Sequence, residues 1–292
     1  MKGLFRVTDW ERVSWWRRTL GALARVVATL VVLDILISLL GPPIGIFFSA
    51  RLMAHKVPAL WQTPKPQADR SISSAPGATF AYFGYQFEVP WNSAFQTRRS
   101  KQEENAPAKG GMVQILFDSG QSVLFIVPID QKGLLTEIVE DPSLSFQSSR
   151  VLLGSLIDAS PYDQYSALLN TTPSSIRAFG PRAEAVRGMV LLTFKGIAPP
   201  GNLESGLFSF EWPGKRGFQI GDPQKPGSVA LEVLDMQGRW VEIICGDRRN
   251  GVKLTQPELN RILVTLRVQP PDLTASQQAG PKAMVKPIRI SR

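Results

Sequence analysis

The most constraining feature of the chain is a strongly apolar run from residue 26 to residue 49. Its letters are VVATLVVLDILISLLGPPIGIFFS, and Asp34 is the one ionisable residue among them. A helix of this length would extend about 36 Å, which exceeds the ~30 Å hydrocarbon core of a bilayer. Tryptophans lie on both sides of the run, as interfacial anchors do, at positions 10, 15, 16 and 61. The run therefore predicts a single transmembrane helix over residues 26–49.

Basic residues near the two ends of this run predict its orientation. Six of them precede it and three lie in residues 50–69, which favours a cytoplasmic N-terminus. A cleaved secretory signal is disfavoured by the long basic lead before the run and by the bulky Phe48 where a small residue would precede the cleavage point. The expected location is the plasma membrane, with the lipid bilayer as a partner and the rest of the chain exported.

Asp34 is the unusual residue of the predicted span. A carboxylate near the middle of a bilayer costs roughly 2.5–3.5 kcal/mol, and such residues usually face protein or water. Ser38, four residues later, would lie on the same helical face and could donate a hydrogen bond. Two interpretations stay open: a contact with another membrane or envelope protein, and an acid that the apolar helix simply tolerates.

The formal net charge of +9 is distributed unevenly. The excess lies in residues 1–25, 51–70 and 272–292, whereas residues 71–271 contain equal numbers of basic and acidic side chains. Nucleic-acid binding needs a basic patch or stripe on the folded part. We therefore expect no nucleic-acid partner.

The composition along the chain predicts five segments. A basic cytoplasmic segment over 1–25 precedes the span, a linker rich in Pro, Ser and Ala covers 50–77, an exported α+β domain covers 78–269, and a basic disordered tail covers 270–292. About 200 residues can bury a single core, so one domain is preferred over two. The expected fold class is α+β, with the transmembrane helix followed by a mainly antiparallel sheet packed with helices.

Alternating apolar residues and turn signals predict the elements of this domain. A Ser-Gly turn would join two strands in a hairpin that pairs Leu116 with Val123. A three-residue loop, Met236–Gly238, would join a second hairpin and place Asp235 opposite Arg239. Thr255 and Glu258 form a capping box, which predicts a closing helix. The expected strands cover 79–89, 112–117, 122–127, 189–195, 207–212, 218–220, 229–235 and 239–245, and the expected helices 144–157, 160–170 and 255–266.

The segment Gly84-Tyr85-Gln86-Phe87-Glu88-Val89-Pro90-Trp91 resembles the G-Y-x-F-x-x-P entry strand of the PsbP-type α/β sandwich. The two hairpins and the closing helix are similar to that topology as well. The resemblance covers the topology and this one motif. It implies a non-catalytic assembly or binding module, and no functional residue of the family can be carried over.

Residue counts exclude several kinds of site. His55 is the one histidine and Cys245 the one cysteine, so histidine-based triads and cysteine-cluster metal sites are excluded. Cys245 alternates with apolar residues and is expected to be a buried, inert thiol. No phosphate-binding loop or calcium loop is present, so no cofactor, metal or catalytic residue is predicted.

Carboxylates are the remaining candidates for chemistry. The register of the second hairpin places Glu232 directly opposite Glu242, on the face away from Cys245, with Trp240 beside them. Like charges across a ladder repel, so the pKa of one carboxyl group could rise far enough for acid–base work. The competing interpretation is a solvated face where arginines offset the repulsion. Tyr85 and Trp91 could line a groove for a carbohydrate or peptide, or pack within the sheet.

Together these observations predict a membrane-anchored, exported binding or assembly module without catalytic activity. The candidate contacts for a ligand or partner are Asp34, Tyr85, Trp91, Glu232, Trp240 and Glu242. One alternative is an envelope hydrolase that uses carboxylates. A second is a small subunit of a membrane complex that makes its main contact through Asp34.

Overall fold

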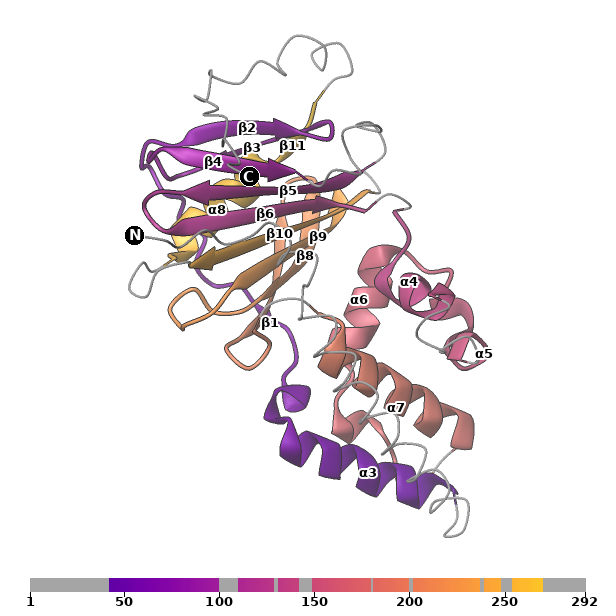
Figure 1. The fold of residues 1–292 in the computed structure, drawn as a ribbon. Helices are drawn as coiled ribbons and strands as arrows, with labels where there is room; N and C mark the ends of the chain where they lie inside the picture. The colour runs from indigo at the N-terminus through magenta and orange to yellow at the C-terminus, as the bar shows by residue number, and fades with distance from the viewer. Residues whose placement is uncertain are drawn as a thin grey trace, which may run out of the picture. The chain divides into compact units, whose positions relative to one another are not determined.

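The computed structural model describes residues 42–99, 110–128, 131–141, 149–179, 181–199, 202–236, 239–247 and 254–269. The chain divides into two compact units, where the sequence favoured a single domain. A helical unit comprises residues up to 63 together with 138–157 and 166–199. A sheet unit comprises 64–137, 158–165 and the residues from 200 onward. Figure 1 labels the helices and strands of both units.

The sheet unit is built on a mainly antiparallel sheet of eight strands in the order β1-β7-β8-β9-β10-β6-β5-β4. Among the strands that the structure describes, the short edge strand β1 alone pairs in parallel, with β7. Hairpins connect β5 to β6, β7 to β8 and β9 to β10, so the antiparallel expectation is confirmed. The strands are β1 Lys65–Pro66, β4 Phe95–Arg99, β5 Gly111–Phe117, β6 Gln121–Val127, β7 Leu207–Trp212, β8 Lys215–Ile220, β9 Val229–Met236 and β10 Arg239–Asp247.

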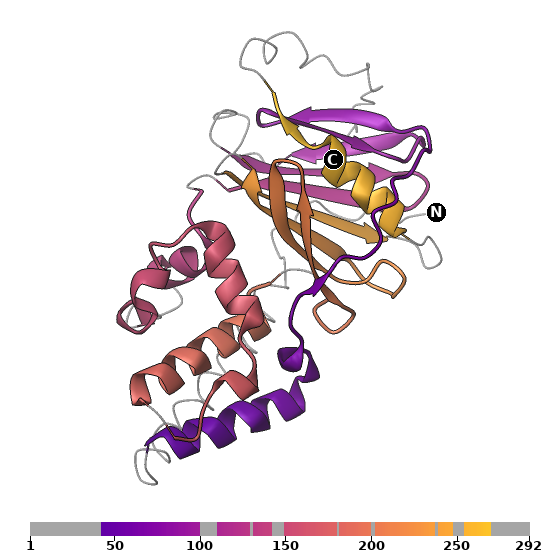
Figure 2. The same ribbon diagram turned by 180° about the vertical axis from the view of Figure 1, so that it is seen from behind.

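A smaller sheet and helix α8 (Gln256–Thr265) cover one face of the large sheet (Figures 1 and 2). The smaller sheet has the order β11-β3-β2, with β2 Ala78–Tyr82, β3 Tyr85–Val89 and β11 Arg267–Val268. Its first two strands replace the one strand expected over 79–89. Phe83 (φ 53°) and Gly84 (φ 78°) adopt left-handed conformations there and reverse the chain.

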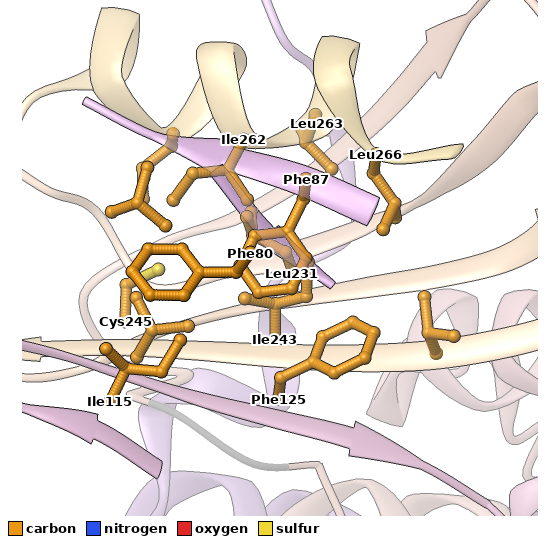
Figure 3. Close-up of a cluster of buried hydrophobic side chains, with 14 of the residues drawn as sticks. Phe80, Phe87, Ile115, Phe125, Leu231, Ile243, Cys245, Ile262, Leu263 and Leu266 are labelled. Atoms are coloured by element: carbon orange, nitrogen blue, oxygen red, sulfur yellow. The ribbon is translucent and has the colours of Figure 1, made fainter. Parts of the chain in front are cut away.

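The core of the sheet unit lies between the large sheet and this cover. Phe80 and Phe87 from the small sheet, Phe125 from β6 and Ile262 from α8 point into it (Figure 3). The hairpin face that carries Cys245, opposite the predicted carboxylate pair and expected to be buried, is fully enclosed in this core: Val229, Leu231, Val233, Val241, Ile243 and Cys245. That part of the prediction is confirmed.

The hairpin of β5 and β6 exists as predicted, but the expected register is wrong by one residue. Leu116 pairs with Ser122, and Ile115 pairs with Val123. The loop contains three residues rather than two, because Gly120 (φ 108°) adopts the left-handed conformation and donates its N–H to Phe117 O at 3.0 Å. A third loop residue shifts the pairing by one position.

The hairpin of β9 and β10 has the predicted register along most of its length. Glu232 pairs with Glu242 and Leu231 with Ile243. Near the loop the prediction is wrong, because Arg239 pairs with Met236 instead of Asp235. The register shifts between Arg239 and Val241, and β9 makes a second shift against β8 at the same level. The pairing beside the loop and the pairing at Glu232 and Glu242 differ in register, and these irregularities accommodate the difference.

The closing helix begins as the sequence predicts. Glu258 Oε2 accepts hydrogen bonds from the Thr255 N–H and from Thr255 Oγ1, both at 2.8 Å, which completes the capping box. Leu259, Ile262 and Leu263 of α8 are fully buried. The segment that was expected to be a free linker lies along this unit: Gln67 N–H donates to Ser209 O, and Asn260 Nδ2 donates to Asp69 O and Ser71 O.

The helical unit is built around α3 (Pro42–Lys56) and α7 (Arg182–Ile197). Ile46, Ala50 and Ala54 of α3 and Met189 and Leu192 of α7 form its buried apolar cluster. Shorter elements complete the unit: η1 Pro58–Trp61, α5 Ser149–Leu153, η3 Gly154–Leu156 and η4 Pro173–Ser175. The boundary between the two units falls within two further helices, α4 (Leu134–Glu140) and α6 (Pro161–Asn170).

The prediction of a strand over 189–195 is wrong, because these residues lie inside α7. The apolar string Met-Val-Leu-Leu-Thr-Phe fits a strand or a buried helix equally well. In α7, the Thr193 hydroxyl donates to Met189 O at 2.9 Å, the bond that lets a β-branched residue sit inside a helix. The helix predicted over 144–157 is present in part, as α5 and η3.

The prediction of a transmembrane helix over 26–49 is wrong, and with it the membrane-anchored, single-pass fold class. Residues 42–49 of that run form the first half of α3, which packs its Ile46 and Ala50 face inside the helical unit. The same helix then continues through Arg51, His55 and Lys56. Within the described ranges, we find no helix that combines the length and the apolar character needed to cross a bilayer. Residues 1–41, with Asp34, and residues 270–292 lie outside the described part of the chain.

Candidate functional site

The predicted carboxylate pair lies at the centre of the large sheet. Glu232 on β9 and Glu242 on β10 are direct partners in the ladder. Their neighbours along each strand, Leu231 and Ile243, point to the opposite face and into the core. The alternation of strand side chains therefore places both carboxyl groups on the face away from the smaller sheet.

Glu232 is enclosed completely. Its relative exposure is 0%, and Trp240 Nε1 donates a hydrogen bond to its Oε2 at 2.9 Å. The Tyr165 hydroxyl lies close enough to the same carboxyl group to stabilise its charged form. Within the described part of the chain, Oε1 has no hydrogen-bond partner. A buried carboxylate oxygen without a donor indicates a group that holds a proton in the folded protein.

Aromatic side chains from α6 and the sheet cover the pair. The Tyr165 ring stacks at 6.5 Å on Phe218 of β8 and meets the Trp240 ring edge-on at 6.0 Å. Tyr162 stacks on the same Phe218 at 5.4 Å, and the Arg216 guanidinium lies 4.0 Å from the centre of the Tyr162 ring. These rings keep water away from Glu232, which accounts for its complete burial.

Two glutamines hold this cover in place. Gln131, itself in a left-handed conformation (φ 50°), accepts a hydrogen bond from Trp240 N–H at 2.5 Å and donates to Trp240 O at 3.1 Å. Gln164, beside Tyr165 in α6, accepts from Leu135 N–H at 3.0 Å and donates to Thr136 Oγ1 at 3.0 Å. The start of α4 and the first turn of α6 are thereby joined above the sheet.

Burial governs the protonation of this site. Desolvation raises the pKa of Glu232 well above its ordinary value, and the charge of Glu242 raises it further. Desolvation also raises the pKa of Glu242, to about 7, with a further contribution from Glu137. The pKa of Tyr165 is raised by burial and by the same glutamates. We therefore expect Glu232 to be protonated at neutral pH and Glu242 to titrate there.

Acid–base catalysis needs contact with a substrate, and the enclosed Glu232 offers no surface for one. A shallow depression of about 390 Å³ lies elsewhere on the sheet unit, lined by Asp69, Gln224, Leu254, Thr255, Gln256 and Pro257. Among the described residues, no group of three or more His, Cys, Asp or Glu side chains could hold a metal ion.

The other predicted contact residues lie apart from the pair. Tyr85 and Trp91 are buried, with relative exposures of 1% and 5%. The Tyr85 ring packs on Phe125 at 5.9 Å, and Trp91 Nε1 donates to Glu258 at 2.9 Å. Of the six residues proposed from the sequence, the structure brings together Glu232, Trp240 and Glu242.

The single thiol is placed as expected, inside the core. Cys245 has no exposed surface, and burial raises its pKa to about 12. We predict that a neutral maleimide modifies Cys245 in the native protein at least about a hundredfold more slowly than free cysteine, because the thiolate is both rare and inaccessible. Mass spectrometry of the native and urea-unfolded protein measures the difference. Rapid labelling of the native protein would contradict this placement.

The sequence interpretation missed an exposed apolar face on α3. Ile44, Phe48 and Leu52 are 41%, 63% and 54% exposed, and their spacing of four residues aligns them along the helix. We call these three residues the α3 outer face. The opposite face of the same helix carries the buried Ile46, Ala50 and Ala54. The signal was present in the sequence, but Ile44 and Phe48 were assigned to the predicted membrane span over 26–49, and Leu52 follows that span.

A buried lysine was missed as well. Lys195 of α7 has no exposed surface, and its Nζ donates to backbone carbonyls of Gln62 at 2.5 Å, Leu169 at 2.7 Å and Thr171 at 2.8 Å, with Leu60 O at 3.5 Å. The sequence had placed this residue at the end of a strand, and no residue pattern marks a lysine that binds carbonyls.

No protein-family model, curated protein or solved structure matches this chain, so its function has to be argued from the geometry above.

Proposed function

We propose that this protein is a non-catalytic assembly module, and that it docks on a partner protein through the α3 outer face. The observation that carries the proposal is that α3 has apolar side chains on two faces. One face is buried by the helical unit, and Ile44, Phe48 and Leu52 face outward. Surface helices normally show one apolar stripe with polar residues opposite.

The chemistry of α3 also indicates the kind of partner. The helix carries Arg51, His55 and Lys56 and contains no acidic residue. An apolar segment that includes a carboxylate would complement both the apolar side chains and the charge. Burying the outer face would contribute about 1–2 kcal/mol for each side chain, estimated from the apolar area removed from water.

The alternative of a carboxylate hydrolase has less support. Its two candidate residues, Glu232 and Glu242, face each other across adjacent strands, and Glu232 is sealed beneath Trp240 and Tyr165. A hydrolase needs two carboxyl groups that flank a substrate within a pocket. The geometry of the pair suits a structural role inside the sheet unit.

We predict that Phe48→Glu abolishes the assembly. In gently lysed cells, particles that contain the wild-type chain are expected to be larger than a single chain, whereas the variant is expected at the mass of one chain. A buried glutamate without a partner costs several kcal/mol, enough to dissociate a typical complex. Size-exclusion chromatography with immunodetection measures the particle size.

Val151→Glu is the matched control, because Val151 is 85% exposed in the same unit and lies on α5 rather than α3. It should leave the particle size unchanged. The proposal would be contradicted if the wild-type chain eluted as a monomer, or if the Phe48→Glu variant formed particles of wild-type size.

A further inference from the structure

We propose that the partner on the α3 outer face is a second copy of this chain, which supplies its apolar run Val26–Leu40. This inference rests on the proposed function, since it names the occupant of the same docking face. Three features carry it: the apolar match, the charge on each side, and the short connection between the run and α3.

The run and the face complement each other in polarity. Val26–Leu40 comprises the letters VVATLVVLDILISLL, in which Thr29, Asp34 and Ser38 are the polar residues. Covering a segment of this composition lowers its free energy, because its apolar surface is removed from water. The α3 outer face is the apolar surface nearest to it along the chain, because α3 begins at Pro42.

The charges match as well. Arg51 lies between Phe48 and Leu52 in sequence and so borders the outer face. Its guanidinium rests 3.4 Å from the centre of the Phe47 ring and donates to Phe47 O at 3.4 Å, and no described carboxylate pairs with it. Asp34 is the one ionisable residue of the run. A carboxylate among apolar side chains needs a cation beside it, and Arg51 can supply that cation.

The connection favours a second copy over the chain's own run. Only Gly41 separates Leu40 from the first residue of α3. A run that covered the outer face of its own α3 would have to reverse direction at Gly41 or give up part of its apolar length to a turn, since reversals next to a helix usually take two to eight residues. A connection that is too short for the reversal favours exchange of the segment between copies.

Photocrosslinking of the full-length chain tests the inference directly. Phe48 is replaced by the photoreactive amino acid benzoyl-phenylalanine, and equal amounts of light and isotopically heavy chain are co-expressed and irradiated in cells. We expect an adduct of two chains, in which position 48 of one copy is joined to a peptide within residues 26–40 of the other. Mixed light–heavy adducts identify the second copy. The same amino acid at Val151 is the matched control and should give no such adduct.

The other products are equally informative. A crosslink from position 48 to a different protein would overturn this inference and leave the proposed function standing. A crosslink to α3 of the second copy would overturn the role of the run. A crosslink within one chain, a crosslink to lipid, or no adduct would overturn both proposals.

A charge exchange tests the contact between Asp34 and Arg51. Arg51→Asp should lower the yield of the two-chain adduct about tenfold, since it places two carboxylates together. The double variant Asp34→Arg, Arg51→Asp should restore at least half of the wild-type yield. A double variant that stays as weak as the single one would contradict the pairing.

Discussion

Replacing Lys195 with Met is expected to lower the free energy of unfolding of the helical unit by about 3–5 kcal/mol at pH 7, because several buried carbonyl groups lose their donor at a cost of about 1–3 kcal/mol each. The side chain binds three parts of the unit at one point: the end of η1 through Leu60 and Gln62, the end of α6 through Leu169 and Thr171, and α7 itself. The last carbonyls of a helix have no partner within the helix and attract cations.

Burial lowers the pKa of Lys195 to about 8, so the amine is still mostly protonated at pH 7. Methionine is similar in length but donates no hydrogen bond, and the variant would therefore leave these carbonyls buried and unsatisfied. Urea unfolding followed by circular dichroism measures the loss.

Lys225→Met is a suitable comparison for Lys195→Met. Lys225 donates to Ser205 O at 2.8 Å on the sheet unit, but it is exposed, so its loss should cost less than about 1 kcal/mol. Equal losses for the two variants, or a fully stable Lys195→Met protein, would show that the buried contacts contribute little.

Stability of the sheet unit is expected to fall by at least about 2–3 kcal/mol between pH 5 and pH 8, and Glu242→Gln is expected to remove about that much of the fall. The folded state raises the pKa of both carboxyl groups above their ordinary values, Glu242 to about 7. At a pH below the ordinary pKa of glutamate, both carboxyl groups are protonated in the folded and in the unfolded state, so the pair does not lower the free energy of unfolding. As pH rises, the unfolded chain releases protons that the folded chain retains, so stability falls, through Glu242 up to about pH 7 and through Glu232 for as long as it stays protonated.

In the Glu242→Gln variant, the amide that replaces the carboxyl group does not titrate, so the share of Glu242 is lost, while Glu232 keeps its hydrogen bond from Trp240 Nε1. Denaturation curves across this pH range measure the effect. Glu211→Gln, a change at an exposed carboxylate on β7, should preserve the wild-type slope. A wild-type protein whose stability is level or rises from pH 5 to pH 8 would refute this account of the pair.

Local patterns predicted the sheet unit well. The alternation in β9 and β10 indicated the pairing of Glu232 with Glu242 and the buried face around Ile243, because a one-residue slip would expose every core residue. The capping box at Thr255 marked the start of α8. The predicted register of β5 and β6 was wrong because the same residues can form a two-residue or a three-residue loop. The φ angle of Gly120 distinguishes the two loops, and the sequence does not give it.

The helical unit was predicted poorly because its segments bury apolar residues against distant parts of the chain. Residues 189–195 of α7 form an apolar string that fits a strand as well as a helix. Residues 42–49 were apolar enough to be taken for part of a membrane span, and only the packing of Ile46 and Ala50 reveals their place in α3. Aromatic cover was equally unpredictable: nothing near Tyr165 in the sequence indicates that it lies above Glu232.

Both units are assembled from separated stretches of the chain, and this sets the order in which a nascent chain can fold. The helical unit joins residues 42–63 to residues up to 199, so it cannot close before α7 has been synthesised. In the sheet unit, β3 pairs with β11, which lies near the other end of the unit's sequence. Strand β1 likewise cannot pair until β7 has been synthesised. Contacts of such long sequence separation slow folding. During synthesis, the apolar hairpin of β5 and β6 stays without its neighbour β10 until residues 239–247 have been made, so it is a segment that chaperones would have to protect.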